Sequence, residues 1–327
     1  MRWLGLGLLA LVVLASLAVA QRHVLLVYAL ASQGAPPLQD AVDEGPDVRW
    51  FDDYFTVQEL DTRTFAIGEP RYAQSNYSYL IAGSERAVLF DAGPGIRDIR
   101  PVAQSLTELP ITFIPSHFHY DHVGNQVTFE DVAVVDLPYL RERAPDGRLQ
   151  LRFAEHLGAA EGIEAPALEV DAWLAPGTTL ALGGRTLRVL YTPGHTEDSI
   201  SLLDLGSAQL FSGDFLYPGP LFAFLPNSGM GDYRQGAETL LRTVPQDARI
   251  FGAHRVAPPG APELALADVR ALRDTLSAIS TGDLEGEGLY PVSYRVNAAI
   301  ELLAEPWWLQ RWTPRHPELG CRTEGRC

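Results

Sequence analysis

The stretch PSHFHYDHVGN, Pro115–Asn125, places three histidines and one aspartate within the six residues from His117 to His122. The whole chain of 327 residues contains only eight histidines. Histidine has only an intermediate tendency to be buried, so packing alone does not explain this crowding. The stretch directly follows the apolar run ITFI at 111–114, which is typical of a strand. Imidazole and carboxylate groups gathered at the end of a strand indicate a metal site.

The spacing within this stretch predicts two groups of ligands. Residues two apart on an extended segment point the same way, so His117 and His119 can converge on one point. Asp121 and His122 come after a bend in the chain. That adjacent pair can then present one oxygen and one nitrogen to a second centre in the same cavity.

Three more candidates lie at predicted strand ends further along the chain. His195 in YTPGHTEDS and His254 in IFGAHRVAP each stand beside Gly or Pro, where the backbone can turn sharply. Asp214 in LFSGDFLY occupies the strand end between them, with a turn or helix cap as its alternative role. Five histidines and two aspartates would suffice for two metals that share one carboxylate.

The sequence around these motifs predicts one domain of mixed α/β layers over residues 50–304. We expect strands at 64–68, 75–83, 86–93 and 111–117, and a helix between 98 and 109. In the second half, Gly183-Gly184 and Gly206-Ser207 predict two hairpin turns. Helices follow at about 232–243 and 264–279.

The H-x-H-x-D-H spacing, the later TPGH and the SGD together resemble the metallo-β-lactamase fold superfamily, in the family's order over most of residues 60 to 260. The resemblance implies the α/β class and an αββα four-layer sandwich, two mixed sheets flanked by helices with the metals at one rim. It implies two divalent ions, zinc first and manganese or iron as alternatives. The implied ligands are His117, His119 and His195 for one metal, Asp121, His122 and His254 for the other, and Asp214 as the bridge. Asp91 in VLFDAGPG matches the family's early aspartate, which implies a hydrogen bond to a ligand imidazole; its alternative role is a turn residue before Gly93.

The chemistry implied by this resemblance is hydrolysis of an ester, lactone or thioester by a hydroxide shared between the two metals. Asp121 is expected to accept or relay a proton as well. Tyr217, three residues after Asp214, either hydrogen-bonds the substrate, as in some lactonases of the superfamily, or simply packs in its loop. The alternatives are a β-lactamase, in which a bridging carboxylate such as Asp214 is generally missing, and an iron-dependent persulfide dioxygenase.

Composition limits the partners. The net charge of −16 disfavours nucleic acid, which needs clustered Lys and Arg. The segment PGPLFAFLPNSGMGDY at 218–233 is apolar, rich in Pro and Gly, and too irregular for a helix or strand. It indicates an apolar or acyl-bearing small-molecule substrate, or else a connection that packs on the core. Nothing in the sequence indicates an oligomeric state.

Both ends of the chain differ from the domain. MRWLGLGLLALVVLASLAVAQ is typical of an export signal cleaved after Ala20, which predicts a periplasmic or secreted protein. The alternative is an uncleaved membrane anchor. Residues 21–49 are expected to form a linker and 305–327 a separate tail. We expect Trp307, Trp308 and Trp312 to pack on the core, with a contact patch as the alternative. Cys321 and Cys327 are expected to form a disulfide, with free thiols or a tail metal site with His316 as the alternatives.

Overall fold

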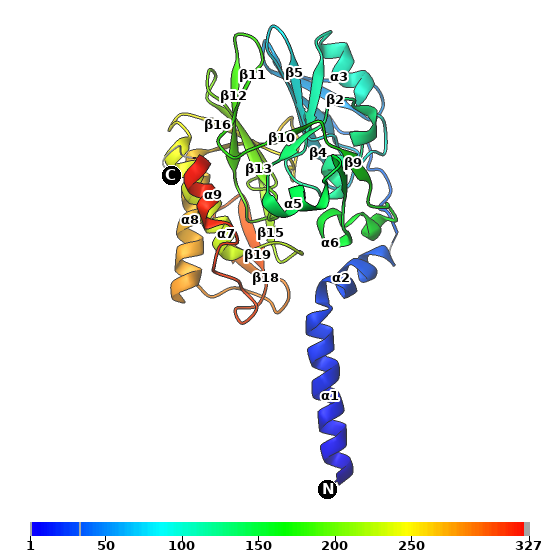
Figure 1. Cartoon of the computed structure of the whole chain (residues 1–327), viewed down its shortest axis with the longest axis vertical. Helices are drawn as coiled ribbons and strands as arrows, with labels where there is room; N and C mark the ends of the chain where they lie inside the picture. Colours follow the sequence, from blue (N-terminus) through cyan, green and yellow to red (C-terminus); the bar gives the residue numbers. More distant parts are fainter. Residues whose placement is uncertain (1, 33, 324–327) are drawn as a thin grey trace.

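The computed structural model describes residues 2–32 and 34–323. Two six-stranded sheets lie against each other, with helices on their outer sides (Figure 1). This four-layered αββα arrangement is the one that the sequence predicted. The confirmed fold matters here because strand ends from both sheets meet at one edge, where the candidate site lies.

The first sheet takes its strands from residues 48–114 in the order β1-β2-β3-β4-β5-β6. Its neighbours are antiparallel except for β5 and β6, which are parallel and joined by helix α3 (Arg100–Leu106). Parallel neighbours need such a crossover, and Pro101 in the first turn suits the start of a helix. The strands are β1 (Val48–Trp50), β2 (Thr56–Asp61), β3 (Thr64–Glu69), β4 (Asn76–Ala82), β5 (Ala87–Phe90) and β6 (Ile111–Ile114).

The second sheet has the order β11-β12-β13-β14-β16-β17. It is antiparallel except for β14 beside β16, and helix α7 (Met230–Thr243) lies in the connection between these two. The hairpin turns expected at Gly183-Gly184 and Gly206-Ser207 separate β11 from β12 and β13 from β14. The strands are β11 (Thr179–Ala181), β12 (Thr186–Tyr191), β13 (Ile200–Asp204), β14 (Gln209–Gly213), β16 (Arg249–Gly252) and β17 (Glu263–Ala265).

Two apolar cores hold the layers together. One contains side chains of both sheets, such as Leu89, Phe113, Leu187 and Phe211. The other packs α7 and α8 (Leu266–Thr281) onto the outer side of the second sheet. Both central strands β4 and β14 are buried along their whole length, including polar residues such as Asn76 and Gln209.

Smaller elements complete the body. The expectation that residues 218–233 form neither helix nor strand is wrong, because β15 (Gly219–Ala223) lies within them and α7 begins at Met230. Strand β15 pairs in parallel with β19 (Ile300–Ala304), which also pairs with β18 (Val292–Arg295). Apolar Leu221 and Ala223 are buried in that pairing, and this outweighs the Pro and Gly nearby. The remaining elements are β7 (Ala133–Val135), β8 (Arg148–Gln150), β9 (Ala167–Glu169), β10 (Ala172–Leu174), α4 (Tyr120–Val123), α5 (Pro138–Arg143), α6 (Phe153–His156), η1 (Gln126–Thr128) and η2 (Gly158–Glu161).

The N-terminal segment forms two helices, α1 (Arg2–Ala20) and α2 (Arg22–Ala31), and α1 projects away from the body (Figure 1). Among the described residues, no single helix has both the length and the hydropathy to cross a membrane. Leu11–Ala20 and Arg22–Ala31 reach that threshold only as a pair, with a 72° bend between them.

The linker expected up to residue 49 is not free of the body. Glu44 is buried, and its carboxylate accepts hydrogen bonds from Arg255 at 2.5 and 2.6 Å. A buried ion pair fixes this segment, and composition alone gave no indication of it because the partner lies more than 200 residues away.

The C-terminal tail also differs from the expectation. Helix α9 (Pro317–Thr323) packs on the body through buried Leu319, so the tail does not stand apart. Trp312 is partly buried against the second core, but Trp307 and Trp308 are exposed, which makes the expected packing wrong for these two. The predicted pairing of Cys321 with Cys327 involves a residue outside the described ranges.

Candidate metal centre

All seven predicted ligands lie at one edge of the sandwich. The strand β6 ends at Ile114, short of the expected residue 117, and His117 and His119 follow it in a bent segment. Helix α4 begins immediately after His119. This short helix provides the predicted bend, so Asp121 and His122 face the same cavity as the two earlier histidines. The loops after β12, β14 and β16 supply His195, Asp214 and His254.

Three imidazole nitrogens meet at the first group. His119 Nδ1 lies 2.9 Å from His117 Nε2 and 3.0 Å from His195 Nε2. Zinc bonded tetrahedrally at about 2.0–2.1 Å separates its nitrogen ligands by roughly 3.3 Å. The three nitrogens therefore already stand close to the spacing that one cation requires.

The second group joins two imidazoles with a carboxylate. His254 Nε2 lies 3.4 Å from Asp121 Oδ2, and His122 Nε2 lies 3.5 Å from the same oxygen. The candidate ligand atoms of these three residues all lie within 4.8 Å of one another. This group offers one oxygen and two nitrogens, as the sequence predicted.

Asp214 lies between the two groups. Its Oδ2 is 3.4 Å from His195 Nε2, while its Oδ1 is 3.3 Å from His122 Nε2 and 3.1 Å from His254 Nε2. The Asp214 carboxylate thus lies close to both groups and presents a different oxygen to each.

The buried atoms fit a cation. Within the described part of the chain, His122 Nε2, His254 Nε2 and Asp214 Oδ1 are buried without a hydrogen-bond partner. Such orphaned atoms are costly unless a further group satisfies them. The donor set of imidazole nitrogens and carboxylate oxygens is consistent with divalent metal binding.

Outer partners orient the imidazoles. Asp91 Oδ2 accepts a hydrogen bond from His122 Nδ1 at 2.9 Å, and Asp91 Oδ1 accepts one from the Ser116 amide at 2.6 Å. Asp91 also has a positive φ of 66°, so it occupies a turn conformation as well. Its two proposed roles, turn residue and partner of a ligand, are therefore present together.

Three of the other ligand histidines also have outer partners. Ser116 Oγ lies 2.9 Å from His117 Nδ1, and the Phe222 and Gln74 carbonyls accept from His195 Nδ1 and His254 Nδ1 at 3.1 Å each. The two carbonyls place the proton on Nδ1 of His195 and His254 and leave Nε2 free for a metal. His119 turns its Nδ1 to the centre, and its Nε2 has no hydrogen-bond partner among the described residues.

The pKa values of the histidines differ between the two groups. Burial and the neighbouring imidazoles hold the pKa of His117 and of His119 well below the ordinary value, so both are neutral. Burial also lowers the pKa of His122, but the carboxylates of Asp121, Asp91 and Asp214 outweigh it and raise that pKa well above the ordinary value. The first group therefore has free nitrogen lone pairs, while protons compete with a cation at the second.

Tyr217 packs beside this centre. Its hydroxyl donates to the Pro220 carbonyl at 2.5 Å, and its ring meets the His254 ring edge-on with centroids 5.1 Å apart. The structure thus records the packing role within the loop. A role of the hydroxyl toward a substrate, like proton transfer by Asp121, stays a prediction.

Several supporting residues were missed by the sequence reasoning. Asn76 Nδ2 donates to the backbone oxygen of Asp121 at 2.7 Å and to its Oδ2 at 3.1 Å. Ser116 adjoins the histidine motif and its position is a usable signal. Asn76 stands 45 residues before its partner, with no pattern that marks it.

Tyr120, inside the motif, was also passed over. Its hydroxyl and that of Tyr72 lie 3.0 Å apart, and both donate to Glu161 Oε1, at 2.8 and 2.7 Å. This network ties α4 to η2 and so stabilises the backbone that carries Asp121 and His122.

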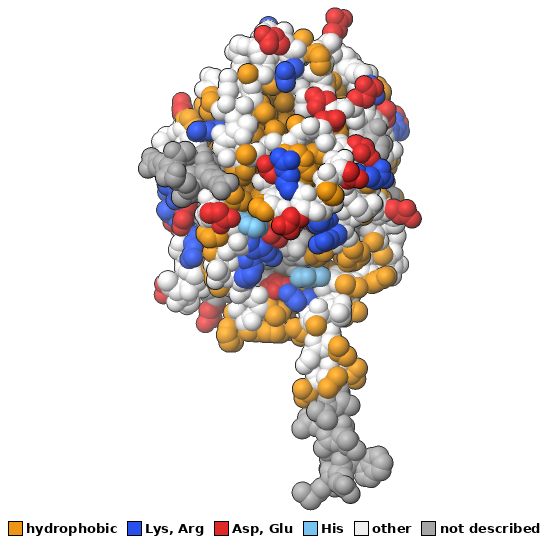
Figure 2. All heavy atoms as spheres, in the orientation of Figure 1, with side chains coloured by type: hydrophobic (Ala, Val, Ile, Leu, Met, Phe, Trp, Pro, Cys, Tyr) orange, Lys and Arg blue, Asp and Glu red, His pale blue; other side chains and the backbone are white. Residues whose placement is uncertain are grey.

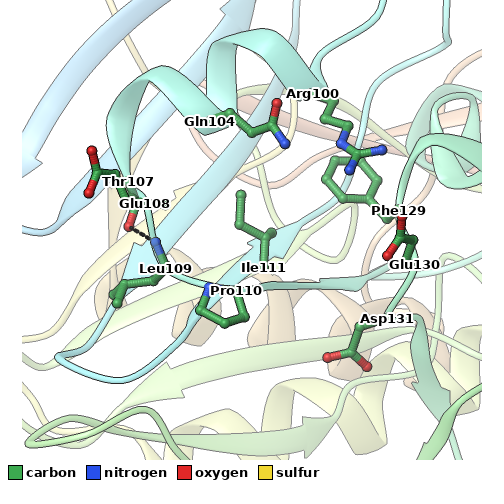
Figure 3. A pocket seen from close by; sticks show the side chains of 10 residues that line it. All are labelled: Arg100, Gln104, Thr107, Glu108, Leu109, Pro110, Ile111, Phe129, Glu130 and Asp131. Carbon is green, nitrogen blue, oxygen red and sulfur yellow. Dashed lines mark hydrogen bonds between the residues drawn. The ribbon is translucent and has the colours of Figure 1, made fainter.

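A surface pocket of about 440 Å³ lies elsewhere, where α3 leads into β6 (Figure 3). Figure 3 shows Arg100, Glu130 and Asp131 around its rim and Phe129 within it. It lies at the opposite end of β6 from His117, so it is not part of the metal centre.

Comparison with known proteins agrees with this geometry. The family model described as the metallo-beta-lactamase superfamily matches residues 71–280, well over half of the chain. The acyl-coenzyme A thioesterase MBLAC2 of Gallus gallus is 28% identical over 233 residues, which cover 62% of this chain and 84% of that protein. A hydroxyacylglutathione hydrolase of Synechococcus is 29% identical over 187 residues, covering 55% and 64% of the two chains.

Solved structures share the fold. A metallo-beta-lactamase from Pontibacter korlensis superposes with a TM-score of 0.51 at 19% identity, covering 68% of this chain and 99% of that one. One from Erythrobacter litoralis also gives a TM-score of 0.51, at 16% identity and 71% and 99% coverage. At these identities the likeness establishes the architecture alone.

Proposed function

The chain belongs to the metallo-β-lactamase superfamily, and from this premise we propose that it is a hydrolase with two metal ions, zinc first, that cleaves acyl thioesters. Hydrolysis is the chemistry that the names of the two relatives above give. The number of ions, their identity and the thioester are the parts that go beyond the family.

The position of Asp214 carries the proposal of two ions. A single-metal site would need only His117, His119 and His195 with one carboxylate oxygen. Here the second oxygen of Asp214 faces His122 and His254, whose Nε2 atoms have no hydrogen-bond partner among the described residues. This second group supports a second ion.

The ligand residues and their hydrogen-bond partners have separate roles in the proposed reaction. When bound, divalent ions supply Lewis acidity, which lowers the pKa of a water and polarises a carbonyl. Ser116 and the Phe222 carbonyl orient the first imidazole group, and Asp91 orients His122. Asn76 donates a hydrogen bond to one oxygen of the Asp121 carboxylate and so orients it. The oriented carboxylate can also accept a proton from a water in the cavity.

The thioester is favoured by the relatives. Both the acyl-coenzyme A thioesterase and the hydroxyacylglutathione hydrolase act, by their names, on acyl groups carried by a larger molecule. Esters, lactones and β-lactams are alternative substrates, because a water can attack their carbonyl groups in the same way. Direct comparison of these substrates in one assay therefore decides between them.

The experiment combines metal analysis with a substrate panel. Purified protein with counted metals is assayed on an acyl-coenzyme A, an acyl-glutathione, a lactone, an aryl ester and a chromogenic cephalosporin. We expect about two zinc ions per chain and fastest cleavage of a thioester. The matched variant Asp121→Asn should lose at least about 100-fold in kcat/KM. Inertness toward all five substrates at full metal content would refute hydrolysis, and one iron per chain with oxygen uptake on a persulfide would favour the dioxygenase instead.

We further propose that the apolar segment at residues 3–20 directs export of the body. N-terminal sequencing of protein recovered from fractionated cells tests this. A start at Gln21 means cleavage after Ala20, and an intact N-terminus in the membrane fraction means an anchor.

A further inference from the structure

Large apolar side chains are exposed around the place where α1 leaves the body. Leu289 is 89% exposed, Trp307 80% and Trp308 54%. Single exposed apolar residues are ordinary, but a group of large ones on one face marks an interaction surface. Figure 2 shows hydrophobic side chains gathered at the bottom of the body beside the base of α1.

Glu305 brings this group to the N-terminal helices. Its carboxylate accepts a hydrogen bond from Arg22 Nε at 2.6 Å and lies 3.0 Å from His23 Nε2, so it fixes the first turn of α2. Trp307 and Trp308 follow Glu305 by two and three residues. On the other side, burial raises the pKa of Tyr290, the neighbour of Leu289, and the charges of Glu305 and Arg22 also act on that pKa.

Helix α2 extends the same face. It turns by 72° from α1 and packs inward through buried Val27, next to η2. Its outward residues are also apolar: Leu25, Tyr28 and Leu30 are 53%, 69% and 45% exposed. Because α2 is apolar on the side that faces the body and also on the side that faces away, we infer that a second apolar partner covers the outer side.

The properties of α1 identify that partner. No charged residue stands between Arg2 and Arg22, and Leu11, Leu14 and Leu17 are exposed on the projecting helix. A helix that is apolar all round suits hydrocarbon. Because α2 bends away at the base of α1, a bilayer into which α1 inserts would meet α2 and the exposed tryptophans at its surface, where Trp and Tyr are enriched.

We propose that the face formed by Leu25, Tyr28, Leu30, Leu289, Trp307 and Trp308 rests on a lipid bilayer, with α2 lying in the interfacial region. The net charge of −16 means that apolar contact, and not attraction to anionic lipid, holds it there. The metal centre and its reaction have no part in this inference.

Fluorescence quenching by brominated lipid tests the proposal on the full chain. All proteins carry Trp3→Phe, which removes the tryptophan of α1 and leaves five of the six in the chain. The protein is reconstituted into phosphatidylcholine vesicles with bromine either near the headgroup or deep in the chains. The double variant Trp307→Phe/Trp308→Phe is compared with Trp173→Phe, whose indole lies under Arg141 at 4.7 Å.

We expect the headgroup-proximal bromine to quench more strongly than the deep one. The double variant should lose at least about half of that quenching, while Trp173→Phe should lose little. Equal quenching in the double variant and its parent would overturn the proposal. So would a dimer in sedimentation that is lost in the double variant, because a second copy of the chain would then cover this face. Replacement of Trp by Phe preserves an aromatic ring, and unchanged metal content verifies the fold.

Discussion

Replacing Asp91 by asparagine separates the two roles that this residue combines. Asparagine tolerates a positive φ as well as aspartate does, so the turn at 66° survives. The variant cannot keep both hydrogen bonds of Asp91, the one from His122 Nδ1 and the one from the Ser116 amide. The single amide oxygen of asparagine can accept from His122 Nδ1 or from the Ser116 amide, and its NH₂ group then faces the other donor.

The magnitude follows from that lost bond. A hydrogen bond to a charged acceptor contributes about 1.5–3 kcal/mol. Loss of the bond that orients a ligand imidazole costs about 10- to 100-fold in metal affinity. We therefore expect Asp91→Asn to weaken zinc at the group that contains His122 by this factor. The first group, with His117, His119 and His195, should lose less, because the change reaches it only through Ser116, which orients His117, and leaves the Phe222 carbonyl on His195 in place.

Competition against a chromogenic chelator measures both steps of zinc release. Asp131→Asn is the matched control, because Asp131 is exposed and its carboxylate accepts a hydrogen bond from Thr112 Oγ1, far from the metal centre. Asp91→Gly completes the series, since glycine accepts the turn but offers no acceptor. If Asp91→Asn and Asp91→Gly both release zinc as the parent does, Asp91 is only a turn residue and the reasoning fails.

Three other variants test separate parts of the structure. Tyr217→Phe should retain kcat within about threefold and lose about 0.5–1.5 kcal/mol in urea unfolding, because its hydroxyl serves the Pro220 carbonyl; a 100-fold loss of kcat would instead mean that it acts on the substrate. Burial, together with nearby Glu155, raises the pKa of Asp198 to about 7, above its ordinary 3.8, so folding favours the protonated acid and stability falls as pH rises from about 4 to 7. Asp198→Asn should flatten that slope and gain up to about 4 kcal/mol at pH 8, and a slope identical to that of the parent would contradict the assignment. Glu44→Gln leaves Arg255 buried without its counter-charge and should lose about 3–5 kcal/mol by the same urea measurement; a loss below 1 kcal/mol would mean that the segment before β1 is a free linker after all.

The fold was predictable because its signals are local. Strand patterns, two Gly-containing hairpin turns and the helical spacing at 99–106 are each readable within a few residues. The ligand set was predictable for a related reason, since each ligand follows a strand end. Parallel and antiparallel neighbours then bring those ends to one edge, which makes the ligands converge.

The rest depends on contacts that no local pattern carries. Glu44 pairs with Arg255 and Asn76 with Asp121 across long stretches of chain. The segment with β15 looked irregular because its partner, β19, comes 81 residues later. The exposure of Trp307 and Trp308 was misjudged because a tryptophan signals burial only when the environment is a soluble core.

The two sheets are tied together beside the metal centre. The Tyr77 amide donates to the Ala253 carbonyl at 2.8 Å, and Tyr79 donates to Gly252 at 2.5 Å. Four candidate ligands come before residue 123 and three after residue 194, so neither half of the polypeptide owns a complete centre. A polypeptide severed between β10 and β11 would thus divide the seven candidate ligands between two fragments, and only the reunited fragments would bring all seven to one edge.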